Sequence, residues 1–234
     1  MAEVRIFSAG AAQAMVERIA VAFGRESGHG VEANFGAVGA MKARIFAGEP
    51  VDVIILTGAL IDELITQGHV VSGSRVDLGT VGTGVAVRKG TPLPDISGEE
   101  PLRGNLLAAT RIVCPDPATA TAGKVVMRAL ERLGIAGQVE PRLQFFPNGY
   151  AAMKWLAQGQ GSRELGITQI TEILANKGVT YAGPLPGELQ VRTVYSVGLA
   201  SRTESTEAAQ AFISRLIAPL SRPALAQAGF EPGN

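Results

Sequence analysis

The chain has 234 residues, enough for one large domain or two modest domains that each bury a core. Hydrophobic residues make up 46% and charged residues 18%, which describes a folded globular protein and excludes a disordered one. The formal net charge is zero and the basic residues are scattered, so no nucleic-acid partner is expected. No apolar stretch is long enough to span a bilayer, so no membrane insertion is expected either.

The start of the chain leaves its localisation open. Met1 is not followed by a charged segment and an apolar one, so the sequence as given contains no secretory signal. The protein is periplasmic if a leader was removed and cytoplasmic if Met1 is the native start. The single cysteine, Cys114, excludes an intrachain disulfide and leaves the redox compartment undetermined. The cysteine and the two histidines also lack the spacing of a zinc site, so we expect no metal. No cofactor is expected either.

The opening of the chain is typical of a strand, a tight loop and a helix. Apolar residues alternate over residues 4–7, small residues follow at 8–11, and apolar residues then recur at helical spacing up to residue 23. A helix that begins after small residues exposes backbone N–H groups and can hold a small anion without lysine or arginine. The alternative is that the small residues only let the helix and the strand pack closely.

Further strand–loop–helix units follow directly. Residues 28–35 and 51–56 are predicted to form strands, and residues 36–46 and 59–67 are predicted to form helices. The run at 51–56 is almost continuously apolar, which is typical of a strand that is covered on both faces. Successive units of this kind imply a parallel sheet with right-handed crossovers.

Two long extended segments separate this region from a second one. Residues 76–89 carry no helical period and are predicted to lead out of a first lobe, and residues 190–201 provide the return path. Between them, strands are predicted at 111–114, 143–146, 164–168 and 179–182, with helices at 98–109, after Gly123, after Pro147 and up to Leu174. The C-terminal segments 207–217 and 221–228 are predicted to be helical.

The pattern predicts an α/β protein of two lobes, each a mainly parallel sheet with flanking helices. Lobe 1 is discontinuous and comprises residues 1–80 plus 197–234, lobe 2 comprises residues 84–190, and residues 81–83 and 191–196 are hinge crossings. Such sheets bind ligands at the carboxyl ends of their strands, so the expected site is a cleft between the lobes.

A series of short motifs runs in order along nearly the whole chain. They are IFSAGA at 6–11, FGAVGA at 35–40, PVDVIIL at 50–56, Asp116-Pro117 with Ala122-Gly123, Leu133-Gly134, LGI at 165–167 and AGF at 228–230. Together they resemble the molybdate-type solute-binding proteins of ABC transporters. The resemblance implies the type II periplasmic-binding-protein fold, with two lobes that close on a ligand about a two-strand hinge. It also implies a tetrahedral oxyanion as ligand, held by hydroxyls and by backbone N–H groups at helix N-termini, and an ABC permease as partner.

The sequence departs from this family pattern in the loops that hold the oxyanion. Ser8 comes before Gly10-Ala11, whereas the family's serine usually lies deeper in that loop. Val38 stands where the family has a small hydroxyl residue. Thr168 and Gln169 follow the last Gly-Ile pair, where the family often has a tyrosine.

These departures bear on the ligand. A charge-assisted hydrogen bond contributes roughly 1.5–3 kcal/mol, so losing two hydroxyl donors weakens binding of a desolvated dianion by several orders of magnitude. The amides of Asn148 and Gln169 and the phenol of Tyr150 suit a planar organic acid better than a tetrahedral oxyanion.

The candidate ligand-binding residues therefore lie in the loops after the strands. Thr57, Thr119 and Thr121 either donate a hydroxyl to the ligand or cap the helix that follows. Tyr150 either projects into the cleft or packs in the interior, and Gln169 is the preferred specificity residue. The full set is Ser8, Gly10, Ala11, Val38, Gly39, Thr57, Thr119, Thr121, Asn148, Tyr150, Thr168 and Gln169.

Two functions remain after this reasoning. The first is a solute-binding protein that closes on a small anion, which is molybdate or tungstate by resemblance or a small organic acid from the loop residues. The second is a cytoplasmic enzyme on the same fold, such as an isomerase or tautomerase of a small organic acid. The residues lean against an enzyme: Asp116, Cys114 and Tyr150 are the only acid–base candidates, and none has a recognisable partner. No catalytic residue is therefore assigned.

Overall fold

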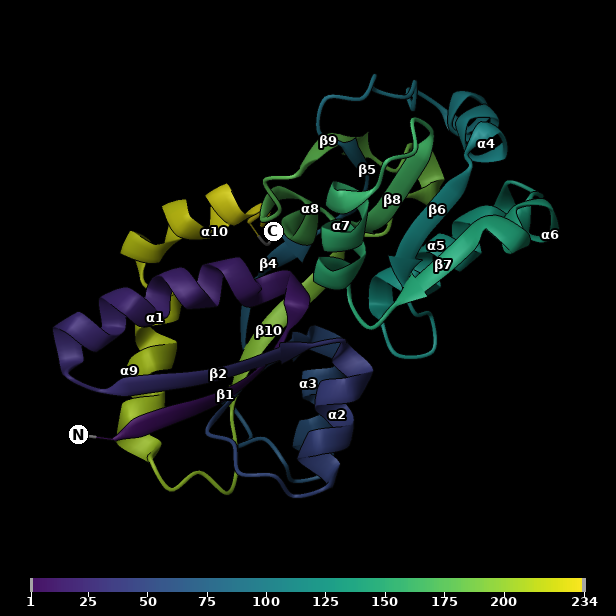
Figure 1. Cartoon of the computed structure of the whole chain (residues 1–234). Coiled ribbons are helices and arrows are strands. Elements are labelled where there is room, and N and C mark those ends of the chain that lie inside the picture. Colours follow the sequence, from purple (N-terminus) through teal and green to yellow (C-terminus); the bar gives the residue numbers. More distant parts are fainter. Residues whose placement is uncertain (1, 233–234) are drawn as a thin grey trace. The chain divides into compact units, whose positions relative to one another are not determined.

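The computed structural model describes residues 2–232 and shows an α/β protein (Figure 1). The chain divides into two compact units. Unit 1 comprises the residues up to Val81 and those from Thr193 onward, and unit 2 comprises Gly82–Arg192. Each unit contains one five-stranded sheet, so the predicted fold class is confirmed.

The sheet of unit 1 has the strand order β2-β1-β3-β10-β4. Its strands are β1 (Glu3–Ala9), β2 (Gly30–Gly36), β3 (Val53–Thr57), β4 (Val76–Val81) and β10 (Thr193–Leu199). β1 is parallel to β2 and β3, whereas β10 is antiparallel to β3 and β4. The carboxyl ends of β1, β2 and β3 therefore lie along one edge of the sheet, which we call the carboxyl edge of unit 1.

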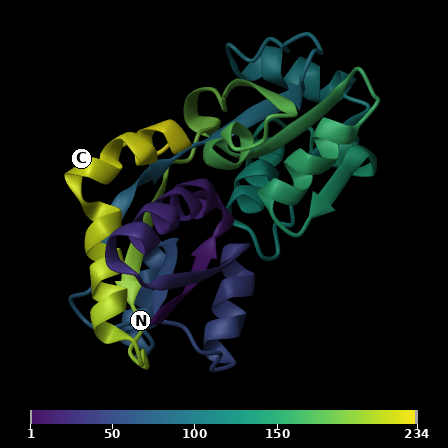
Figure 2. The same cartoon turned by 60° about the vertical axis from the view of Figure 1, so that its left-hand side comes forward.

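Helices cover this sheet in two groups (Figure 2). The helices are α1 (Gln13–Ser27), α2 (Val38–Phe46), α3 (Gly58–Thr66), α9 (Thr206–Ile217) and α10 (Arg222–Ala228), with 3-10 turns at Gly10–Ala12 and Pro219–Ser221. α1 contacts α9 and α10. An ion pair between Lys42 and Glu63, 2.7 Å apart, joins α2 to α3. The C-terminal segment thus completes the core that the first third of the chain begins.

The sheet of unit 2 has the strand order β7-β6-β8-β5-β9. Its strands are β5 (Thr83–Arg88), β6 (Arg111–Pro115), β7 (Leu143–Phe146), β8 (Glu164–Gln169) and β9 (Val179–Pro184). Its helices are α4 (Glu99–Ala108), α5 (Thr121–Arg132), α6 (Ala136–Val139), α7 (Gly149–Gln158) and α8 (Ile170–Leu174), with 3-10 turns at Glu140–Arg142 and Gly187–Leu189. β6 is parallel to β7 and β8, and β5 is antiparallel to β8 and β9.

Side chains of β6 alternate between two buried clusters of unit 2. Ile112 and Cys114 pack with the apolar residues of α4, α5 and α6, whereas Val113 packs with those of α7 and α8. Successive side chains of a strand point to opposite faces, so helices cover this sheet on both faces. The carboxyl ends of β6, β7 and β8 form the carboxyl edge of unit 2.

Some element boundaries differ from the sequence expectation. Ser8 and Ala9 belong to β1 and not to the loop, because they continue the pairing with β2 as far as Gly36. α5 begins at Thr121, ahead of Gly123, whose missing side chain lets the first turn pack against the backbone of Pro115. The short helix α6 was not expected from the sequence.

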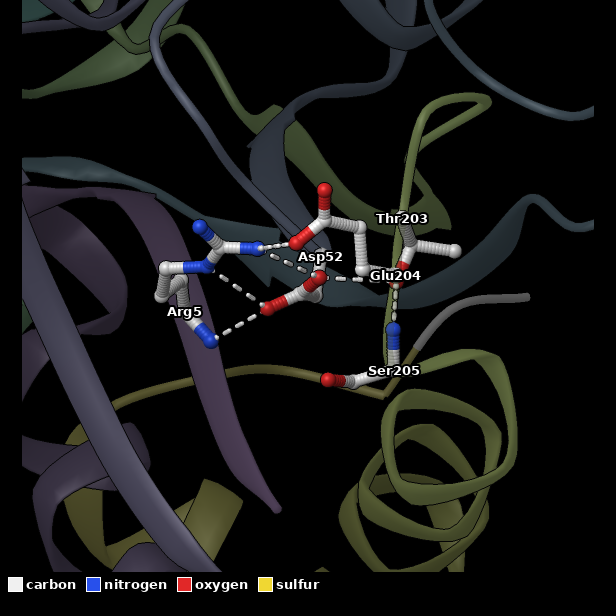
Figure 3. Close-up of polar contacts among 5 residues, drawn as sticks. All are labelled: Arg5, Asp52, Thr203, Glu204 and Ser205. Atoms are coloured by element: carbon white, nitrogen blue, oxygen red, sulfur yellow. Dashed lines mark hydrogen bonds and ion pairs between the residues drawn. The ribbon is translucent and has the colours of Figure 1, made fainter.

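A buried carboxylate, Asp52, stabilises the unit 1 sheet at the amino-terminal ends of its parallel strands, opposite the carboxyl edge (Figure 3). Its Oδ2 accepts hydrogen bonds from the backbone N–H of Arg5, at 2.8 Å, and from Nε of Arg5, at 3.2 Å. Its Oδ1 accepts a hydrogen bond of 2.7 Å from the hydroxyl of Thr203. These bonds join β1, the start of β3 and the segment after β10 at the amino-terminal ends of the parallel strands.

None of the helices between residues 2 and 232 has the length and apolar character needed to cross a membrane.

Candidate functional site

Helices begin directly after the parallel strands at the carboxyl edge of unit 1. The residues before α2 and α3, Ala37 and Thr57, have extended backbone, and neither side chain caps its helix. The first N–H groups of these helices therefore have no side-chain acceptor and face the end of the sheet. Such groups favour an anion through their partial positive charge.

The predicted residues at this edge contribute mainly backbone groups. Ser8 is fully buried, and its hydroxyl donates a 3.0 Å hydrogen bond to the carbonyl of Ala9. Gly10 and Ala11 are buried in the 3-10 turn, and neither residue has a polar side chain. Val38 opens α2 and packs its side chain against the core, and Gly39 follows in the same turn.

An ion-paired arginine that the sequence reasoning missed lies beside the first residue of α3. A Cβ at Gly58 would be 2.7 Å from Nη2 of Arg75. Arg75 pairs with Asp77 at 2.9 Å and with Asp62 at 2.5 Å. Asp77 also accepts a 2.6 Å hydrogen bond from the Ser196 hydroxyl. The arginine charge is thus balanced by two carboxylates, and the glycine makes room for the guanidinium.

At the carboxyl edge of unit 2, Asn148 caps α7 with its own side chain. Its Oδ1 accepts a 2.9 Å hydrogen bond from the backbone N–H of Ala151. Tyr150 is half-buried in the first turn of this helix. α5 has no side-chain cap, since it follows Ala120; Thr121 is its first residue and Thr119 is exposed just before it. Neither threonine therefore acts as the N-cap of α5.

Polar side chains without partners gather at the same edge. Thr83 of β5 lies opposite Gln169 of β8 in the antiparallel register, and Thr171 follows in α8. All three residues are almost completely buried. Within residues 2–232, the hydroxyls of both threonines and both ends of the Gln169 carboxamide have no hydrogen-bond partner. We call these three residues the orphan cluster. A buried polar group left unsatisfied costs about 1–3 kcal/mol, so these side chains are suited to bond polar groups of a ligand.

A buried carboxyl group, Glu172, lies next to the orphan cluster. Burial raises the pKa of Glu172 to about 7, even though hydrogen bonds from the Thr168 hydroxyl and from the backbone of Gly149 and Gln169 lower it. The Thr168 bond measures 2.6 Å. A Cβ at Gly149 would lie 1.9 Å from Oε2 of Glu172, so only glycine fits there. The sequence reasoning missed Glu172, because a glutamate within a short helix ordinarily lies on the surface.

The predicted residues thus fall into two groups, one at the carboxyl edge of each sheet. The structure also shows the surroundings of two acid–base candidates from the sequence, Cys114 and Asp116. Burial, together with the charge of Asp116, raises the pKa of Cys114 to about 12, so the thiol is not a nucleophile at neutral pH. Asp116 accepts a 2.8 Å hydrogen bond from the backbone of Ala118 and closes its own loop. Among the residues that the structure describes, no group of acidic, histidine or cysteine side chains is arranged to hold a metal ion.

Comparison with known proteins gives both sequence and structural relatives. The model of the bacterial extracellular solute-binding protein family matches residues 4–231. An aconitate isomerase from Pseudomonas sp. is 28% identical over 97% of this chain and 87% of its own length.

Solved structures share the fold of the whole chain. The periplasmic molybdate-binding protein of Azotobacter vinelandii has a TM-score of 0.84 and 21% identity over 99% of this chain and 100% of its own. The sulfate-binding protein SubI of Mycobacterium tuberculosis has a TM-score of 0.78 and 18% identity over 100% of this chain and 88% of its own. Because the family model covers nearly the whole of the two-unit chain, this chain belongs to the bacterial extracellular solute-binding protein family.

Proposed function

We propose that this solute-binding protein takes a small organic di- or tricarboxylic acid. The observation that carries the proposal is the orphan cluster, in which the Gln169 carboxamide is buried and unpaired opposite Thr83. An amide and hydroxyls recognise carboxyl and hydroxyl groups through hydrogen bonds of both directions. Backbone N–H groups at the uncapped start of α5, at the carboxyl edge of the same unit, supply the attraction for negative charge.

A tetrahedral oxyanion fits the observed donors less well. Val38 offers no hydroxyl, and the hydroxyl of Ser8 already donates to a backbone carbonyl. Two charge-assisted donors that would face a molybdate or sulfate ion are therefore missing, at roughly 1.5–3 kcal/mol each. The name of the sequence relative, aconitate isomerase, also favours an organic acid over a metal oxyanion.

A thermal-shift comparison tests the proposal. Citrate, cis- and trans-aconitate, malate and succinate are compared with molybdate, tungstate and sulfate on the purified protein. A ligand at 100 times its Kd stabilises the folded chain by about 2.7 kcal/mol. For a chain of this size that corresponds to a rise in Tm of roughly 5–10 °C. We expect this rise with at least one organic acid. A rise with molybdate or tungstate alone would refute the proposal and support an oxyanion receptor, whose partner is an ABC permease.

A second candidate is an isomerase of a small unsaturated organic acid. The aconitate isomerase relative, which this chain matches over nearly its full length, favours it. Glu172 supports it too, because a carboxyl group with a pKa of about 7 can both take up and release a proton at neutral pH. Following the cis and trans isomers of aconitate by NMR in the presence of the protein separates the two functions. An enzyme interconverts them and loses turnover in Tyr150→Phe or in Glu172→Gln, whereas a receptor binds them unchanged.

A further inference from the structure

The orphan cluster is held in a fixed geometry by a neighbouring glutamine. The Gln190 side chain accepts a 2.8 Å hydrogen bond from the backbone N–H of Thr83 and donates one of 2.8 Å to its carbonyl. The backbone N–H of Ile170 donates to the carbonyl of Gly82 at 2.9 Å, which ties the start of α8 to β5. Thr83 and Gln169 therefore remain opposite each other without any bond between their side chains.

The cluster offers acceptors as well as donors. The Gln169 amide has two N–H donors and one carbonyl acceptor, and each threonine hydroxyl can donate one hydrogen bond and accept others. A ligand group that can only accept, such as an ionised carboxylate or an oxyanion, satisfies the N–H donors and leaves Oε1 of Gln169 unpaired. Since an unpaired buried acceptor is costly, the cluster discriminates against such a group.

We propose that the orphan cluster is a subsite for an O–H group of the bound acid, in which Oε1 of Gln169 accepts the hydrogen and the amide N–H and the Thr83 hydroxyl bond the oxygen. The O–H is either the hydroxyl of a hydroxy acid or the proton of a half-ionised carboxylic acid. Gln169 is then the residue that sets specificity, and Gln190 positions the subsite through Thr83. This inference rests on the proposed organic-acid function and narrows its ligand class.

Ligand pairs that differ by one hydroxyl test the subsite. Malate is compared with succinate, and citrate with tricarballylate, by isothermal titration at a pH where all the acids are fully ionised. A site built to hydrogen-bond a hydroxyl strongly rejects the analogue that lacks it. We expect the hydroxylated member of a pair to bind the wild type at least about tenfold more tightly. At a lower pH each acid keeps one proton. If the plain acids then bind the wild type more tightly, and if this gain is lost in Gln169→Met, the carboxyl proton is the source of the O–H.

Gln169→Met supplies the decisive comparison, because methionine has a similar shape and no hydrogen-bonding group. The preference for the hydroxylated acid should fall to within about twofold, while the plain acid keeps its affinity. The Tm of the ligand-free variant should stay the same or rise, since an unsatisfied buried amide has been removed. The matched control is Gln158→Met at the exposed end of α7, which should leave both the preference and the Tm unchanged.

Each other outcome overturns the inference. If the organic acids bind but show no O–H preference at either pH, or if Gln169→Met keeps the preference, the subsite is wrong while the proposed function stands. If no organic acid binds the wild type, the proposed function fails and the subsite fails with it. A fall in the Tm of ligand-free Gln169→Met would show that the amide has a structural role.

Discussion

Replacing Asp52 with alanine is expected to lower the free energy of unfolding by about 3–5 kcal/mol. The Asp52 side chain is fully buried and accepts hydrogen bonds from the backbone and guanidinium of Arg5 and from the Thr203 hydroxyl. Removing the carboxylate leaves these donors without an acceptor and removes the side-chain hydrogen bonds that join three segments (Figure 3), while the backbone bonds of residue 52 to Arg5 and Ala200 remain.

Urea unfolding of the variant beside the wild type measures this loss. Glu204→Ala is the matched control, because Glu204 lies 3.7 Å from the same guanidinium but its side chain is 86% exposed. An exposed ion pair contributes little, so the control should change the free energy of unfolding by less than about 1 kcal/mol. Equal losses of unfolding free energy in the two variants would show that the Asp52 carboxylate does not stabilise this edge of the sheet.

The Asp52 network also has a pH dependence of known sign. Burial alone would raise the pKa of Asp52, but the hydrogen bonds from Arg5 and Thr203 lower it below its ordinary value. A carboxyl group with a lowered folded-state pKa stabilises the protein above its unfolded-state pKa. That stability is lost as the pH falls through the folded-state value, so this network weakens only in acid.

The second large effect is expected at Glu172 and has the opposite sign. Burial raises its pKa from 4.5 to about 7, so the folded chain binds a proton that the unfolded chain releases between these pH values. The stability that the protonated group contributes is present below pH 4.5 and is lost as the pH rises through 7. At 1.36 kcal/mol per unit of pKa, the loss is about 3 kcal/mol.

Glu172→Gln keeps the shape of the protonated group and cannot ionise. The variant should be more stable than the wild type at pH 8, by up to about 3 kcal/mol, and should lack the decline between pH 4.5 and 7. Unfolding free energies measured across this range test the prediction. The matched control is Glu131→Gln on the exposed face of α5, which should decline as the wild type does. A decline that persists in Glu172→Gln would assign it to another group.

The sequence predicts the fold well because the chain repeats a strong local pattern. The apolar run over β3 and the small residues before α2 predict strand, loop and helix without any tertiary information. The return of the C-terminal helices to unit 1 follows from the two extended segments. The boundary at Ser8 is less well predicted, because pairing with β2, and not local preference, extends β1.

The candidate site is predictable only in part. Gln169 stands out from the sequence because it comes at the carboxyl end of a buried strand, and sheets of this type bind ligands at that end. Thr83 does not, because its place opposite Gln169 results from the antiparallel pairing of strands far apart in the chain. Glu172 and Arg75 are likewise identified only by burial and by contacts across elements. Local patterns carry no information about these contacts.

The most direct test of the account is an NMR titration of the isotope-labelled protein with citrate. We expect the side-chain amide resonances of Gln169 to shift, together with the backbone amides of Thr121 and Ala122 at the start of α5. The resonances of the cavity lined by Leu78, Leu225 and Phe230 should remain unchanged. Shifts confined to that cavity, or to the Asp52 edge of the sheet, would contradict the proposed site.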